Sequence, residues 1–226
     1  MIISRKHKFI FIKSKKTAGS SIQAALAKVC DKTDLVTGLL SSNYSILDQK
    51  RKHQISYNLL KNKQKLLEPP LKRHITSHIP LKKLKSTLKD EYNNFFKFAF
   101  IRNPWDLVVS KFFWNKHIHK HDFDDFHQWL WQEYQFEIWK ADQLHLYTHI
   151  DGKYDLDFMG RYENIEQDFQ YVCDQLHIGT LKLGNEKRIS RKRKHYTEYY
   201  SEQDQHLVAR LFQKDIDYFD YKFGEN

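Results

Sequence analysis

Apolar residues gather in two short runs along the chain, and each run ends in a polar turn followed by a helical repeat. The first run covers residues 9–12, and after its turn Ile22, Ala25, Leu26 and Val29 recur at i, i+3, i+4 and i+7. A run of this length indicates a buried strand, and the later spacing indicates an amphipathic helix. The pattern predicts a strand–turn–helix unit over residues 9–29.

The second run covers residues 95–101 and leads into Pro104, a residue that suits the first position of a helix. Four apolar residues then recur at helical spacing: Trp105, Val108, Val109 and Phe112. A second strand–turn–helix unit is therefore expected. Two such units in one chain predict an α/β protein with a central parallel sheet flanked by helices.

Weaker patterns predict further elements. Leu81, Leu84 and Leu88 follow Pro80 at the spacing of a short helix, and residues 153–158 alternate as a half-buried strand. Residues 201–204 resemble a capping box that opens the last helix.

The first turn carries the residues of an anion-binding site. Lys15 and Lys16 supply positive charge, Gly19 permits close approach of the backbone, and Ser20 and Ser21 offer hydroxyl donors and a helix cap. Backbone N–H groups at such a turn and at the following helix N-terminus face one point in space. The turn therefore predicts a ligand with phosphate or a similar group.

This turn is not the phosphate loop of ordinary nucleoside triphosphatases. That loop requires an opening glycine and a lysine placed after the second glycine. Here no glycine opens the turn, and Lys16 precedes Gly19. A nucleoside triphosphate site is therefore disfavoured.

The second turn adds a guanidinium and a hydroxyl group. Arg102 follows the predicted strand directly, and Ser110 lies eight residues further along the helix. An arginine fork and a hydroxyl can hold one phosphate monoester. Because the carboxyl ends of parallel strands form the ligand crevice of such sheets, both turns should open on one edge. A ligand phosphorylated at two places is predicted.

Two stretches, KTAGSS after FIFIKSK and the later FAFIRNPWDLVVSKFF, resemble the two cofactor signatures of the carbohydrate sulfotransferases of Golgi type and of bacteria. The resemblance continues through DFMGRYENIEQDFQYVC and DIDYFDYKF, and so spans most of the chain. It implies a P-loop-NTPase-like fold, one sulfotransferase domain over residues 1–226, and 3′-phosphoadenosine-5′-phosphosulfate (PAPS) as sulfuryl donor. One departure is Lys15, which stands where the family commonly has proline.

The resemblance also assigns roles to residues of the two turns. Arg102 and Ser110 would hold the 3′-phosphate of the donor. The 5′-phosphosulfate would be held by Lys16, Thr17, Ala18, Gly19, Ser20 and Ser21.

Sulfuryl transfer to a hydroxyl needs a base for the acceptor proton, and histidine suits neutral pH. The family places a histidine between the two cofactor elements. His74 matches that position best, and His78 is the reserve candidate. The resemblance gives Lys16 a second, catalytic role, in which it stabilises charge on the leaving bisphosphate.

A basic run over residues 187–194 leaves two interpretations open. Arg191 and Lys192 could close over the nucleotide or meet the acceptor, as a basic loop does in the family. A run of like charges is also typical of a solvated loop.

Composition fits one compact domain. The 226 residues include 7 Gly and 4 Pro, and no linker-like stretch divides them. No stretch reaches the length of a membrane span, and the apolar run at the N-terminus stops before Lys13. We expect a cytoplasmic protein that requires no metal.

The formal net charge of +10 admits rival functions. A basic nucleic-acid-binding protein is one rival, although no zinc-finger spacing, RNP-like signature or basic zipper is present. A P-loop-like nucleotide kinase is another, although no carboxylate cluster for Mg²⁺ is apparent. We expect an O-sulfotransferase without a nucleic-acid partner, whose acceptor is a polysaccharide or glycolipid sugar, including one that is already anionic.

Overall fold

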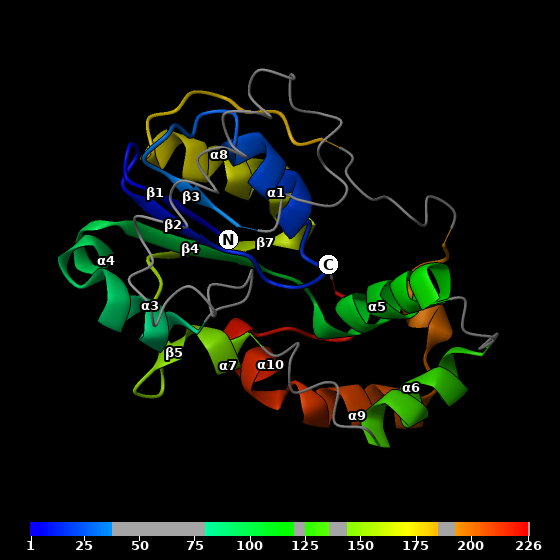
Figure 1. Cartoon of the computed structure of the whole chain (residues 1–226). Helices are drawn as coiled ribbons and strands as arrows, with labels where there is room; N and C mark the ends of the chain where they lie inside the picture. The colour runs from blue at the N-terminus through cyan, green and yellow to red at the C-terminus, as the bar shows by residue number, and fades with distance from the viewer. Residues whose placement is uncertain (38–79, 120–124, 136–143, 185–192, 226) are drawn as a thin grey trace.

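The structure is a computed structural model, and it describes residues 1–37, 80–119, 125–135, 144–184 and 193–225. Within these residues a five-stranded sheet runs through the centre of the molecule in the order β3-β1-β2-β4-β7 (Figure 1). Its strands are β1 (Ile2–Ser4), β2 (Phe9–Ile12), β3 (Leu35–Val36), β4 (Phe96–Ile101) and β7 (Phe158–Arg161).

The sheet is mostly parallel. β2 pairs with β4 in parallel, and β4 pairs with β7 in parallel, whereas β1 runs antiparallel to both β2 and β3. The reason is the short turn between β1 and β2, because two adjacent strands joined by a few residues must run in opposite directions. The α/β class with flanking helices is confirmed, with one antiparallel strand inside the sheet.

Successive side chains of β2 and β4 point to opposite faces of the sheet and build two cores. The aromatic side chains of Phe9, Phe11, Phe98 and Phe100 belong to one core. Helices α1 (Gly19–Leu26) and α8 (Ile165–Gln175) cover this face, as Figure 1 shows.

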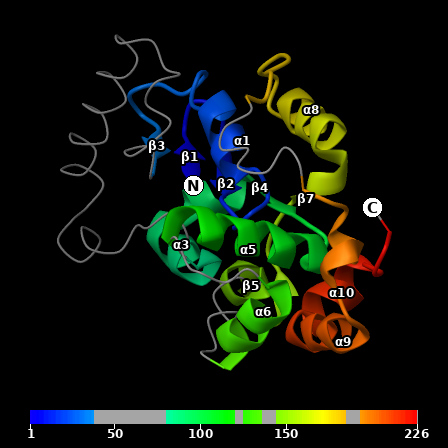
Figure 2. The same ribbon diagram turned by 90° about the vertical axis from the view of Figure 1, so that its right-hand side faces the viewer.

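The opposite face presents smaller side chains, among them Ile10, Ile12, Ala99 and Ile101. It is covered by a layer of helices, with α5 against the sheet and α6 and α9 farther out (Figure 2). This layer comprises α3 (Leu81–Leu88), α5 (Pro104–His119), α6 (Phe126–Gln135), α7 (His145–Thr148), α9 (Glu202–Leu211) and α10 (Gln213–Phe219).

The two predicted strand–turn–helix units are present. β2 leads through a turn into α1, and β4 leads into α5, whose first residue is Pro104. The inward residues of α5 are buried as expected, Val108 and Val109 completely.

The strand predicted over residues 153–158 is wrong in its extent. Residues Lys153–Tyr154 form β6, which pairs with β5 (His149–Ile150) in a separate hairpin. Residues Phe158–Arg161 form β7 of the main sheet. The backbone changes partner between Asp155, whose N–H donates to the carbonyl of Thr148, and Asp157, whose N–H donates to the carbonyl of Lys97.

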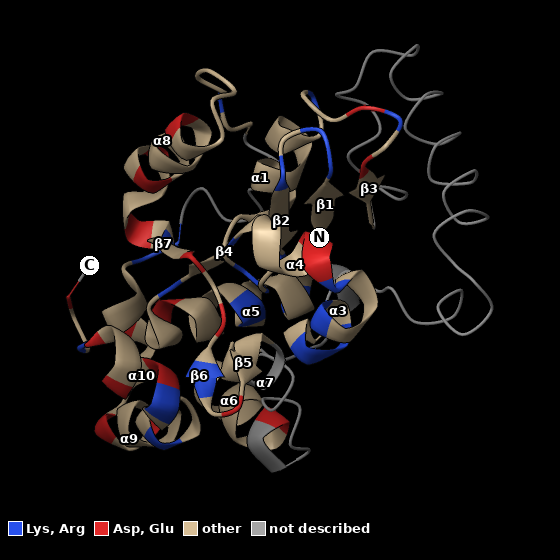
Figure 3. Ribbon diagram, turned by 90° about the vertical axis from the view of Figure 1, so that its left-hand side faces the viewer, with Lys and Arg blue, Asp and Glu red and all other residues tan. Residues whose placement is uncertain are grey.

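The helix predicted after Pro80 is confirmed, since Leu81 and Leu84 of α3 are buried. Its lysines Lys82, Lys83, Lys85 and Lys89 are exposed. Figure 3 shows this blue stretch beside α4 (Asp90–Asn94), which leads into the amino end of β4. Part of the positive charge of the chain therefore lies away from the carboxyl edge of the sheet.

The predicted capping box is also present, but it opens α9 and not the last helix, because α10 follows. The Ser201 hydroxyl accepts a hydrogen bond from the N–H of Asp204, and the Asp204 carboxylate accepts one from the N–H of Ser201. Two short 3₁₀ helices complete the set of elements. η2 (Tyr162–Asn164) lies between β7 and α8, and η3 (Tyr196–Tyr199) precedes α9.

Candidate functional site

The two turns lie side by side at the carboxyl edge of the sheet. β2 and β4 are parallel neighbours, with Ile12 opposite Ala99, so the chain leaves both strands in the same direction. The first turn connects β2 to α1, and the second connects β4 to α5. The sequence-based expectation that both turns share one edge is confirmed.

The first turn is fastened to β4 by its own hydroxyl groups. The Ser14 hydroxyl donates to the carbonyl oxygen of Phe100, and its oxygen lies 2.7 Å from Oγ1 of Thr17. Both side chains are buried. The hydroxyl of Thr17 is therefore used within the protein, and only its backbone remains as a group for a ligand.

The backbone of this turn is held in an unusual conformation. Lys16 and Ala18 have φ values of 61° and 56°, in the left-handed region that non-glycine residues rarely adopt. Such residues are found at binding sites, where the surrounding structure stabilises them. At Gly19, an added Cβ would lie 2.9 Å from Cγ of Lys13, so a glycine is required for close packing.

The N-terminus of α1 differs from the sequence-based prediction. Ala18 occupies the N-cap position and no side chain caps the helix, so the prediction that Ser20 and Ser21 cap it is wrong. These serines are the second and third helical residues, with Ser20 half-buried and Ser21 buried. The positive end of the helix therefore faces the turn without a carboxylate or hydroxyl cap.

The second turn is tied to the first by Arg102. Its Nη1 donates to the carbonyl oxygen of Lys16 over 2.7 Å, which joins two segments 86 residues apart in sequence. The guanidinium is buried, and its central carbon lies 3.9 Å from the centroid of the Tyr162 ring. The predicted anion-binding residues Lys16 and Arg102 are thus brought together.

Arg102 is also paired with the carboxylate of Asp106, a residue that is not among the predicted site residues. Its Nε and Nη2 lie 2.8 Å and 2.7 Å from Oδ2 of Asp106, in the first turn of α5. Arg102 precedes α5, so the rule for pairs four residues apart on a helix face gave no signal of this pairing.

The loop lysine reaches over α5. Nζ of Lys16 lies 4.6 Å from the centroid of the Trp114 ring, one helical turn after Ser110. Ser110 itself is half-buried on this helix. The ammonium group of Lys16 therefore lies over the part of α5 that carries Ser110.

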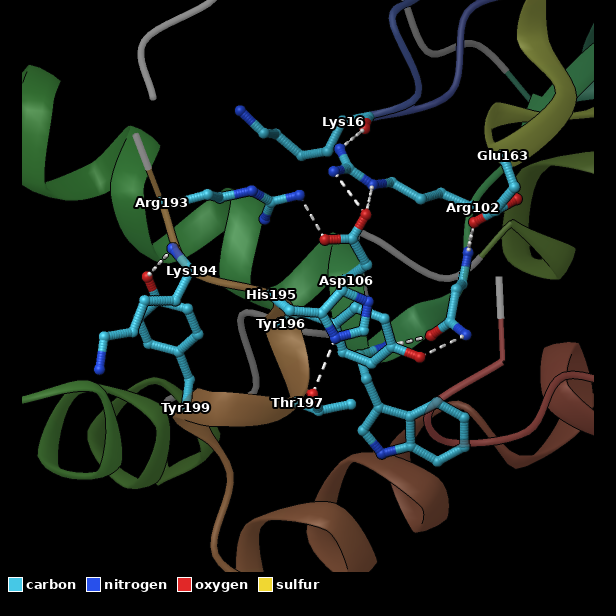
Figure 4. Close-up of polar contacts among 12 residues, drawn as sticks. Lys16, Arg102, Asp106, Glu163, Arg193, Lys194, His195, Tyr196, Thr197 and Tyr199 are labelled. Atoms are coloured by element: carbon cyan, nitrogen blue, oxygen red, sulfur yellow. Dashed lines mark hydrogen bonds and ion pairs between the residues drawn. The ribbon is translucent and has the colours of Figure 1, made fainter. Parts of the chain in front are cut away.

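A third segment contributes Arg193. Its Nη2 lies 2.5 Å from Oδ1 of Asp106, so this carboxylate stands between two guanidinium groups, as Figure 4 shows. Nη1 of Arg193 is buried and has no hydrogen-bond partner among the described residues. Arg191 and Lys192, the residues of the basic run predicted to contact the nucleotide or the acceptor, lie outside the described residues.

Asn103 connects the second turn to the end of the chain. Its Nδ2 donates to the carbonyl oxygens of Lys222 and Glu225 over 3.2 Å and 3.0 Å, and its Oδ1 accepts from the N–H of Trp105. The N–H of Asn103 in turn donates to Oε1 of Glu163 over 2.6 Å. These contacts fix the turn that positions Arg102.

A small pocket adjoins the first turn on the side of α10. Its lining includes Ser14, Lys15 and Thr17 from the first turn and Asp215 from α10. Asp215 accepts a hydrogen bond from the hydroxyl of Tyr154 over 2.8 Å, and its Oδ1 lies 3.3 Å from Nδ1 of His145. No sequence signal joins His145 to Asp215, because 70 residues separate them.

The histidines that the sequence favoured as base, His74 and His78, lie outside the described residues. Among the residues that are described, no group of three or more potential ligands could hold a metal ion. In the same residues, no helix combines the length and apolar character needed to cross a membrane.

The fold and the site define an α/β protein with two neighbouring, positively charged turns on one edge of its sheet. The chain belongs to the sulfotransferase family, because the sequence profile described as "Sulfotransferase family" matches residues 1–222. Members of this family transfer sulfuryl groups.

An uncharacterized protein of Archaeoglobus fulgidus is 31% identical over 94 residues, which are 40% of this chain and 74% of that protein. No solved structure matches the chain.

Proposed function

We propose that this protein transfers a sulfuryl group from PAPS to a hydroxyl of a carbohydrate acceptor, a polysaccharide or a glycolipid sugar. The observation that carries the proposal is the hydrogen bond from Arg102 to the carbonyl of Lys16, which joins the two turns into one cationic site. A donor with separate 3′ and 5′ phosphate groups matches a site of this kind.

The hydrogen-bond donors and positive charge of the first turn suit the 5′-phosphosulfate of such a ligand. The turn presents the Lys16 ammonium, the backbone of Thr17, Ala18 and Gly19, and a helix N-terminus that no side chain caps. Ser20 and Ser21 lie in the first turn of that helix. Backbone N–H groups and a positive helix end stabilise phosphate oxygens.

At its 3′ end the ligand would meet Arg102, Ser110 and Arg193. The buried Nη1 of Arg193 supports this arrangement, because a buried donor without a partner is costly and a phosphate oxygen would satisfy it. Arg191 and Lys192, in the same basic run, are proposed as further contacts to the nucleotide.

When bound, PAPS supplies the sulfuryl group that is transferred in line. The acceptor oxygen forms its bond to sulfur as the bond from sulfur to the phosphate oxygen breaks, and the hydroxyl proton passes to a histidine. We propose His74 as this base, with His78 in reserve. Lys16 would stabilise the charge that develops on the leaving phosphate oxygen.

Calorimetric titration with 3′-phosphoadenosine-5′-phosphate, without Mg²⁺, tests the donor class. Wild type should bind the bisphosphate more tightly than ATP or 5′-AMP, and Arg102→Ala should lose at least about 1.5 kcal/mol. Lys82→Ala, an exposed lysine of α3, is the matched control and should bind normally. Bisphosphate binding no tighter than that of 5′-AMP would overturn the proposal and favour a kinase or a nucleic-acid-binding protein.

Transfer of labelled sulfate from PAPS to a panel of polysaccharides and glycolipids then tests the acceptor and the base. His74→Ala should lower kcat by about 10²–10⁴-fold with little effect on bisphosphate binding. If His78→Ala alone has this effect, the base assignment moves to His78. Transfer to no carbohydrate, with intact bisphosphate binding, would refute the acceptor class.

A further inference from the structure

The carboxylate of Asp106 links two arginines from distant parts of the chain. Oδ2 accepts from Nε and lies 2.7 Å from Nη2 of Arg102, whereas Oδ1 accepts from Nη2 of Arg193. Each oxygen thus serves a different guanidinium, and the two arginines are 91 residues apart in sequence. The side chains of Arg102, Asp106 and Arg193 are 4%, 13% and 21% exposed.

The charges of this cluster do not cancel. Two guanidinium groups surround one carboxylate, and the backbone of Lys16 is bonded to the same Arg102. Arginine stays protonated in proteins, so the cluster keeps a net positive charge in a poorly solvated place. A bound anion would compensate this charge, and the carboxylate alone cannot.

The pairing also leaves a specific donor for a ligand. Asp106 occupies Nη2 of Arg193, and the buried Nη1 on the same planar group has no partner among the described residues. Because the guanidinium is planar, fixing one Nη group fixes the direction of the other. The carboxylate therefore orients the donor without consuming it.

From this geometry we propose that Asp106 is a positioning residue. It holds Arg102 and Arg193 in place before the ligand arrives, and so couples the basic segment after residue 192 to the anion site. The inference rests on the proposed function for the identity of the ligand. It adds that a negative side chain inside a cationic site strengthens anion binding.

A purely local role makes a different prediction. An acidic residue in the first turn of a helix interacts favourably with the helix dipole, whatever side chains surround it. Asp168 has such a place in α8, where its carboxylate accepts from the N–H of Arg161 rather than from Arg102 or Arg193. Asp168→Asn is therefore the matched control for Asp106→Asn.

The first experiment needs no ligand. Phenylglyoxal modification followed by mass spectrometry measures the reactivity of each arginine in the ligand-free protein. Asp106→Asn should raise the reactivity of Arg193 and Arg102 at least about fivefold, and Asp168→Asn should leave it unchanged. Equal reactivity in wild type and Asp106→Asn would overturn the proposal, whatever the ligand of the site is.

The second experiment is a double-mutant cycle in the titration with 3′-phosphoadenosine-5′-phosphate. Asp106→Asn should weaken binding about tenfold or more, and Arg193→Gln should cost less in the Asp106→Asn background than in wild type. Asp106→Glu keeps the charge and should restore part of the affinity, and it serves if the asparagine variant does not fold. Additive effects, or tighter binding by Asp106→Asn, would refute the positioning role.

The two proposals fail in different ways. If wild type does not bind the bisphosphate, the proposed function fails and the modification experiment still decides the role of Asp106. If wild type binds and Arg102→Ala weakens binding, while Asp106→Asn binds like wild type, only the positioning role fails.

Discussion

The ammonium group of Lys16 lies 4.6 Å from the centroid of the Trp114 ring, so the cation of the first turn rests on the helix of the second. A cation over an aromatic face contributes about 0.5–1 kcal/mol at a partly exposed position. This contact directs the lysine toward α5 and the region of Ser110.

Replacing Trp114 tests this contact. Trp114→Ala should weaken binding of 3′-phosphoadenosine-5′-phosphate about 2–5-fold, because Lys16 loses the ring that orients it. Trp114→Phe keeps an aromatic face and should have a smaller effect. Calorimetry on both variants measures the difference, and an alanine variant with wild-type affinity would show that the ring does not orient the lysine.

Gly160 of β7 allows Phe100 of β4 to pack against the strand. A Cβ at this position would lie 2.5 Å from Cε1 of Phe100, inside the van der Waals contact distance. Gly160→Ala should lower the free energy of unfolding by about 1–3 kcal/mol because the ring must move. Urea denaturation measures this loss.

Phe100→Leu provides the companion variant, since a smaller side chain relieves the clash. Gly160→Ala should cost less in this background than in wild type. An equal cost in both backgrounds would place the strain elsewhere.

Asn103 should contribute strongly to stability, because its side-chain amide is buried and both its Nδ2 and its Oδ1 make hydrogen bonds. Asn103→Ala removes the cap of Trp105 and the donors to Lys222 and Glu225, at a cost of about 2–3 kcal/mol. Asn103→Asp keeps the capping oxygen and should be intermediate. Urea denaturation gives the order, and an aspartate variant as unstable as the alanine variant would contradict it.

The pKa of His149 lies below its usual value, mainly because the ring is buried and secondly because of the charge of His145. The charge of Lys214 also lowers this pKa, whereas the charge of Asp215 raises it. The unfolded chain therefore binds more protons than the folded protein near this pKa, and stability increases with pH. This contribution is present above about pH 6.5 and is lost as the pH falls below it.

Denaturation curves between pH 8 and pH 5 test this effect. His149→Gln has no titrating ring, so its stability should fall less steeply over the same range. An identical pH dependence in wild type and variant would assign the effect to other groups.

Local patterns were sufficient to predict the frame of the site. Periodicity identified β2, α1, β4 and α5 because each strand is buried and each helix has one apolar face. The parallel arrangement then brought Lys16 and Arg102 to one edge without further information.

Local patterns could not predict which side chains of the site pair with one another. Arg102 pairs with Asp106 and Arg193, and Ser14 bonds to Phe100, because distant segments approach one another in the folded chain. The cap of α1 was predicted wrongly for a related reason, since the left-handed backbone at Ala18 moves the helix start ahead of Ser20.

The bonds from Asn103 to the carbonyls of Lys222 and Glu225 also have a consequence for synthesis on the ribosome. β2, its turn and α1 emerge early, but the second turn acquires its final contacts only after residues 222–225 have left the exit tunnel. A nascent chain that is stopped before Lys222 carries both turns and still lacks the bonds that tie Asn103 to the carbonyls of Lys222 and Glu225. The second turn therefore reaches its final bonding only after the chain has extended 119 residues beyond Asn103.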